Sequence, residues 1–215
     1  MTLVLALRGV AAIAVLTTLA GGLPRLVQLG LAVTMGLWAA LIAAPALPAH
    51  DVSLVMVAAH ELIIGATLGL VAAVPLLAAA AAGRLVDVTS SPRQGPYASL
   101  FSLLAAAVFV GIDGHVAVVT ALVDSYRTAP AIMDGAPRVL TALGRLIPAA
   151  VTLALPWLVT AAVIEIAAGA GMRLAGRAGL HVPTAAAVPA ALVMITATLV
   201  GTLAVAIAAL VRAAL

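Results

Sequence analysis

The sequence predicts an all-α, polytopic membrane protein with about six hydrophobic helical segments, several of them broken or hairpin-like. Of its 215 residues, 66% are apolar and only 8% are charged, and the mean hydropathy is +1.31. A soluble domain carries about 25% charged residues and about 45–50% apolar ones. Because so little polar surface cannot cover a globule in water, a soluble enzyme, a disordered regulator and a nucleic-acid-binding domain all fit poorly.

The expected elements are apolar stretches of roughly the length, about 20 residues or more, that a helix needs to cross a bilayer. They cover Leu3–Ala20, Leu26–Ala44, Leu54–Ala82, Tyr97–Val123, Leu146–Gly171 and Ala185–Val211. Glycine and proline mark the breaks between them, at Gly21–Pro24, Pro45–Pro48, Ser90–Pro96, Ala129–Pro130, Gly135–Pro137 and Gly179–Pro183. No break is long enough for an interdomain linker, so we expect one helical membrane domain over residues 1–215. Arg8 lies inside the first stretch rather than ahead of it, which favours mature protein over a signal peptide.

The arginines leave the orientation in the membrane open. Cytoplasmic loops are normally richer in Arg and Lys, but the ten arginines divide equally between the two sides and the chain has no lysine. One explanation is that some stretches are half-helices or hairpins buried in a larger assembly, where this rule has little hold.

Three places in the apolar stretches stand out. The fourth stretch is interrupted by Gly111, Ile112, Asp113, Gly114 and His115, which predicts a helix break at membrane depth. Such a break is tolerated only where protein covers it or water lines it. The other two places, Glu61 and Glu165, are carboxylates within apolar segments, where a charge needs a partner or a cavity.

Both glutamates begin a pattern with four-residue spacing. Gly65 and Gly69 follow Glu61 on one helix face, and Gly169 and Arg173 follow Glu165 in the same way. Small residues at this spacing let membrane helices approach closely. The recurrence is compatible with internal duplication or with coincidence in a chain rich in alanine and glycine.

No catalytic or cofactor site is expected. The four histidines are spread along the chain, no cysteine is available for a zinc site, and a phosphate-binding loop with lysine is impossible. The serines lie mainly in polar loops without a nucleophile motif. We therefore expect a protein that is not an enzyme, with no catalytic, cofactor-binding or metal-binding residues.

Several motifs together resemble the FliR/SctT family, the export-gate subunits of flagellar and virulence-associated type III secretion systems. They are Leu23–Ala32, Glu61–Gly69 with its E-x-x-I-G-x-x-x-G pattern, Asp113–His115 followed by Leu122–Pro130, Ala154–Pro156, and Glu165–Gly169. The matches occur in order over most of the chain. Residues 181–184 depart from the family pattern, so the choice between a flagellar and a virulence-type system stays open.

The resemblance implies one copy of the chain in a helical assembly at the entrance of the secretion channel in the bacterial inner membrane. The implied partners are SctR/FliP-like and SctS/FliQ-like membrane subunits, an SctU/FlhB-like switch protein, and the secreted proteins in transit, with membrane lipid around them and no nucleic acid. On this hypothesis residues 111–115 form a plug-like element of the pore. The assembly or packing residues would be Glu61, Gly65, Gly69, Asp124, Arg127, Pro130, Glu165 and Gly169.

The alternative is a small secondary transporter. Broken helices and acidic residues near the bilayer midplane are also typical of transporter substrate sites. Glu61, Asp113 and Glu165 would then relay protons or bind a substrate.

Overall fold

The computed structural model describes residues 2–21, 23–43, 54–90, 96–127, 135–178 and 187–214. Within these ranges the chain is helical and contains no strand. The helices are α1 (Thr2–Ala20), α2 (Arg25–Ala43), α3 (Leu54–Ser90), α4 (Tyr97–Gly111), α5 (Gly114–Arg127), α6 (Gly135–Arg177) and α7 (Ala187–Ala214). The prediction of an all-α membrane protein is confirmed.

The number of membrane-spanning segments also agrees with the sequence. In the described ranges α1, α2, α3, α6 and α7 are each long and apolar enough to cross a bilayer. α4 and α5, which meet at an angle of 66°, make a sixth span if the bent pair crosses the membrane as one unit. The chain is a multi-pass membrane protein.

The lengths of two helices differ from expectation. α3 has 37 residues and α6 has 43, so at 1.5 Å per residue α6 is about 65 Å long. The predicted break at Gly135–Pro137 is wrong, because α6 begins at Gly135. Pro137 lies in the first turn, where a missing N–H costs no helical hydrogen bond.

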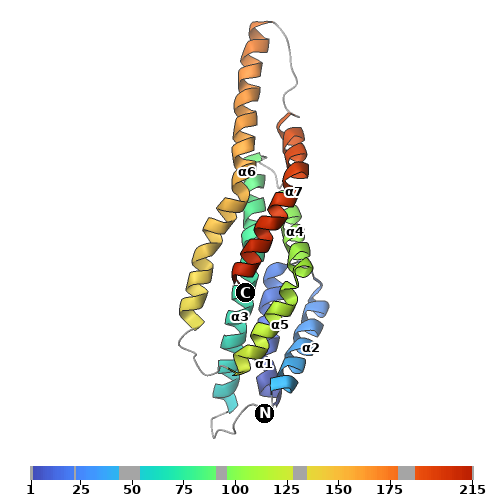
Figure 1. The fold of residues 1–215 in the computed structure, drawn as a ribbon, viewed down its shortest axis with the longest axis vertical. Coiled ribbons are helices and arrows are strands. Elements are labelled where there is room, and N and C mark those ends of the chain that lie inside the picture. The colour runs from blue at the N-terminus through green and yellow to red at the C-terminus, as the bar shows by residue number, and fades with distance from the viewer. Residues whose placement is uncertain are drawn as a thin grey trace.

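α3 organises the bundle. It packs against α1, α4, α6 and α7, and α1 packs against α2. In Figure 1 α3 and α6 run along the long axis, with α1 and α2 side by side in the lower half. The upper part of α6 extends beyond the rest of the bundle, and α7 descends beside it to end near mid-height. α6 also bends partway along its length (Figure 1), which is typical of a helix with internal prolines such as Pro148 and Pro156.

A buried aromatic pair packs between helices α4 and α6. Trp157 of α6 and Phe101 of α4 meet edge to face, with 5.0 Å between ring centroids. The indole N–H of Trp157 donates a hydrogen bond to the hydroxyl of Thr196 on α7, over 3.1 Å. This arrangement connects α4, α6 and α7 with the polar atom of the tryptophan paired.

Candidate functional site

The predicted break in the fourth segment is present. α4 ends at Gly111, α5 begins at Gly114, and Ile112 and Asp113 form the turn between them. Asp113 has φ of +57°, a left-handed conformation that aspartate tolerates better than most residues with a side chain. The Asp113 carbonyl accepts hydrogen bonds from the backbone N–H groups of Val116 and Ala117, and these bonds start α5 in its new direction.

The side chains at the break differ in environment. Gly111, Asp113 and His115 are exposed, whereas Gly114 is buried. A Cβ atom at Gly114 would lie 2.7 Å from the Phe109 ring and 2.8 Å from the Phe109 carbonyl oxygen, but at Gly111 it would meet nothing within 4 Å. Gly114 is thus required for the shape of the bend, and Gly111 faces open space.

The first end of the bent pair is anchored to α3. Both carboxylate oxygens of the buried Asp87 accept backbone hydrogen bonds at the start of α4, from the N–H of Tyr97 and of Ala98, each over 2.9 Å. These N–H groups have no partner within the helix, and the negative charge also complements the helix dipole. Gly83 lets the two backbones approach, because a Cβ there would overlap the Tyr97 carbonyl oxygen.

The second end is anchored to α1. The Arg8 guanidinium donates to the Ser125 backbone carbonyl over 2.6 Å and to its hydroxyl over 3.2 Å. It also lies over the Tyr126 ring, 4.4 Å from the centroid, a cation–π contact. The Tyr126 hydroxyl donates to the Leu5 carbonyl over 2.6 Å. Both ends of the bent pair are therefore held by buried polar contacts, while Gly111, Asp113 and His115 of the bend are exposed.

Glu61 completes this cluster. Arg8 Nε donates to Glu61 Oε2 and Arg8 Nη2 to Glu61 Oε1, each over 2.8 Å, and both residues are at most 4% exposed. This two-point geometry is the strongest form of an arginine–carboxylate pair. Both oxygens of the Glu61 carboxylate accept hydrogen bonds from Arg8. Glu61 is therefore not the free acid that the transporter hypothesis requires for proton relay or substrate binding.

Close approach of α1 and α3 makes the pair possible. A Cβ atom at Gly65 would lie 2.1 Å from the Arg8 carbonyl oxygen, and one at Gly69 would lie 2.2 Å from the Ala12 carbonyl oxygen. The structure therefore places Gly65 and Gly69 against a helix of the same chain, as their spacing indicates. Whether they also act in assembly stays a prediction.

The second pattern has a different environment. Glu165 is exposed on α6, and its carboxylate has no ion-pair or hydrogen-bond partner in the ranges that the structure describes. A Cβ atom at Gly169 would meet nothing within 4 Å. The two similar patterns thus differ: one is buried within the chain, and the other faces outward.

The remaining expected residues give less information. Asp124 is exposed on α5, Pro130 lies outside the described residues, and so does the Arg127 side chain. Within the described ranges no group of three His, Asp or Glu side chains could hold a metal ion.

Sequence reasoning missed Arg8, Ser125 and Tyr126 as functional side chains. The signal was present, because Arg8 is a lone cation inside an apolar segment and such a charge needs a carboxylate nearby. Ser125 and Tyr126 belong to the motif that follows the bend.

The fold and this site define a class of protein, a multi-pass helical membrane protein whose buried polar groups serve packing and whose broken span exposes three residues at its bend. Over residues 1–214 the chain matches the family model described as "Bacterial export proteins, family 1". The chain therefore belongs to this family, the FliR/SctT family, and is a component of a bacterial protein export apparatus. No curated protein matches it.

Proposed function

We propose that the chain is an export-gate subunit of a type III secretion system, flagellar or virulence-associated, and forms part of the secretion channel entrance in the bacterial inner membrane. The observation that carries this proposal is the match to the export family over residues 1–214. The subunit acts as one helical domain beside SctR/FliP-like and SctS/FliQ-like subunits and an SctU/FlhB-like switch protein. It catalyses no reaction and binds no cofactor.

The exposed apolar surface of α6 supports a shared assembly. Leu140 and Leu174 lie near opposite ends of this helix and are 70% and 66% exposed. They are 34 residues apart, about 50 Å along the helix, whereas the hydrocarbon core is about 30 Å thick. Since lipid tails do not readily cover both ends at once, neighbouring subunits are the better cover for part of α6. Large exposed apolar patches are typical of such interfaces.

The bend between α4 and α5 is the candidate constriction. Backbone without helical hydrogen bonds is tolerated at membrane depth only against protein or a water-filled cavity. Gly111, Asp113 and His115 of the bend are exposed on this chain. In the assembly these three would line the closed pore as part of a plug-like element, and Ile112 and Gly114 would form its inner side, packed against the chain's own bundle.

Dependence on partners tests the assembly. We expect the chain, expressed with SctR/FliP-like and SctS/FliQ-like proteins of its own species, to purify as one copy in a large hetero-oligomer whose mass native mass spectrometry resolves. Expressed alone, it should be inert in export, even where detergent keeps it folded. A stable monomer or homodimer that ignores these partners would contradict the proposal, and a transport assay with Glu61 and Glu165 variants would follow.

Single cysteines test the position of the bend. The chain has no native cysteine, so every thiol signal belongs to the introduced residue. We expect Gly111→Cys and His115→Cys to crosslink to an export substrate stalled in transit and carrying one cysteine. The matched control is Gly30→Cys on α2, where a Cβ also meets nothing within 4 Å, and it should not crosslink. Equal crosslinking at the three positions, or none at the bend, would exclude these residues from the path of the substrate.

A further inference from the structure

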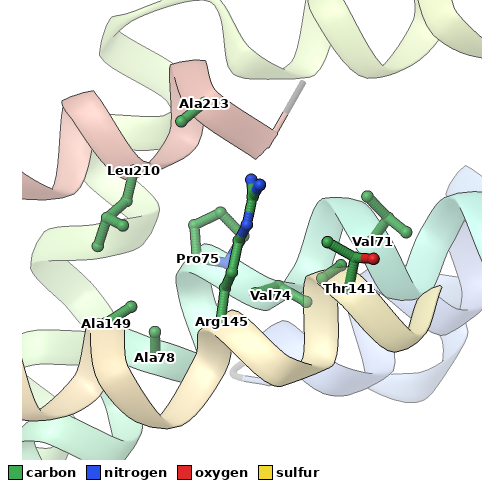
Figure 2. Close-up of a pocket in the computed structure, with 10 residues that line it drawn as sticks. Val71, Val74, Pro75, Ala78, Thr141, Arg145, Ala149, Leu210 and Ala213 are labelled. Carbon is green, nitrogen blue, oxygen red and sulfur yellow. The ribbon is translucent and has the colours of Figure 1, made fainter. Parts of the chain in front are cut away.

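A cleft lies between α3, α6 and α7, away from the bend. Its volume is about 380 Å³, within the range of pockets that hold a small ligand. Its walls are formed by apolar side chains with one hydroxyl and one cation among them: Val71, Val74, Pro75, Ala78, Thr141, Ala142, Arg145, Ala149, Leu210 and Ala213. Figure 2 shows the Arg145 side chain reaching from α6 past Pro75 of α3, with Leu210 and Ala213 of α7 on the far side.

Arg145 is the charged member of this lining, and within the described ranges its guanidinium has no ion-pair or hydrogen-bond partner. Its guanidinium group carries a positive charge and offers five N–H donors. A cation in a membrane-spanning segment pairs with an anion or reaches toward water. An anion at the mouth of the cleft would satisfy it.

The position of the cleft identifies the source of the anion. Every lining residue belongs to a segment long and apolar enough to span the membrane, 54–89 of α3, 139–177 of α6 or 193–213 of α7. Where no partner subunit covers these segments, the medium around them is lipid. A small soluble anion would leave the apolar walls uncovered, and a neutral apolar ligand would leave Arg145 unpaired. A phospholipid with a net negative headgroup satisfies both, and basic pockets between membrane helices are known to take such headgroups.

We propose that this cleft binds one anionic phospholipid, with an acyl chain along Val71, Val74 and Ala149 and the headgroup phosphate on Arg145. The inference goes beyond the proposed export function and does not depend on it. The lipid would connect α3, α6 and α7 at the level where α7 ends.

Native mass spectrometry of the protein purified with its partners, or alone if it is stable, tests this directly. The probe is phosphatidylglycerol titrated into detergent micelles, with phosphatidylcholine as the zwitterionic reference. We expect Arg145→Gln to weaken phosphatidylglycerol retention about fivefold and to leave phosphatidylcholine retention unchanged. Arg145→Lys should keep most of the preference. The matched control, Arg173→Gln, removes another exposed arginine of α6 outside the cleft and should have no effect.

A second variant separates the acyl chain from the headgroup. Ala149→Phe fills the cleft and keeps Arg145, so we expect it to lower phosphatidylglycerol retention as well. Equal retention in Arg145→Gln, Arg173→Gln and the unmodified protein would overturn the proposal. Competition by inorganic phosphate at equal concentration would also overturn it, because the site would then recognise an anion without its tail. A third contradicting result is loss of a partner subunit in Arg145→Gln with lipid retention intact, since a carboxylate of that partner would then be the anion.

Discussion

Glu61→Gln is expected to destabilise the protein by about 3–5 kcal/mol, because it leaves the guanidinium of Arg8 buried without its counter-charge. Arg8 is 1% exposed and bonds both oxygens of Glu61 at 2.8 Å, so neither group can turn to water. Arg8→Ala should cost at least as much, since it also removes the contacts to Ser125 and Tyr126. The free energy of unfolding in mixed micelles, followed by circular dichroism during denaturing-detergent titration, measures both effects.

The chain provides its own control for this prediction. Glu165 is the other glutamate of the sequence and is exposed on α6. Glu165→Gln should therefore leave the stability of the isolated chain within about 0.5 kcal/mol of the unmodified protein. The double variant Arg8→Met with Glu61→Leu removes both charges and should recover most of the loss, as in other buried ion pairs. Glu61→Gln as stable as Glu165→Gln would show that the pair does not hold the helices together.

In the Arg8–Glu61 pair, the sequence alone predicted Glu61 as a buried acid but not Arg8 as its partner. A glutamate in an apolar segment predicts that a partner exists. It does not identify that partner, which here is one of ten arginines and lies 53 residues away in the sequence. That choice depends on the register between α1 and α3, and the register is set by Gly65 and Gly69 against α1. Local pattern therefore identified the residues that need explanation, and only the packing of two helices identified the partner.

The bend was predictable from local sequence, whereas the start of α6 was not. The break at Gly111–His115 was predictable because a Gly-x-Asp-Gly run interrupts an apolar helix by local backbone preference alone. The extension of α6 to Gly135 was not predicted, since a glycine followed by a proline two residues later reads as a loop. Proline in the first turn is compatible with either structure. The anchors at the two ends of the bent pair, Asp87 and Arg8, join segments distant in sequence, so no local pattern identifies the residues that they contact.

Gly65→Ala and Gly169→Ala should change stability in opposite directions, although each adds one methyl group to a glycine that follows a glutamate by four residues. At Gly65 the new Cβ would lie 2.1 Å from the Arg8 carbonyl oxygen. α1 must then move away from α3, which costs about 1–3 kcal/mol and also lengthens the Arg8–Glu61 contact. At Gly169 the methyl group meets open space, and replacing a helical glycine by alanine should stabilise the isolated chain by about 0.5–1 kcal/mol.

The same pair of variants then separates packing within the chain from packing between subunits. Thermal unfolding of the isolated chain should show a lower unfolding temperature for Gly65→Ala and a higher one for Gly169→Ala. Equal losses would contradict the geometry of the α1–α3 contact.

In the hetero-oligomer, a bulkier substitution tests whether the surface around Gly169 contacts a partner subunit. If a partner helix uses Gly169 for close approach, Gly169→Leu will leave the isolated chain stable but reduce the yield of the complex in native mass spectrometry. The equally open Gly144→Leu on the same helix is the control, because its methyl groups add the same volume away from the Glu165 pattern. A complex that tolerates both substitutions equally would remove Gly169 from the assembly surface while leaving the role of Gly65 inside the chain intact.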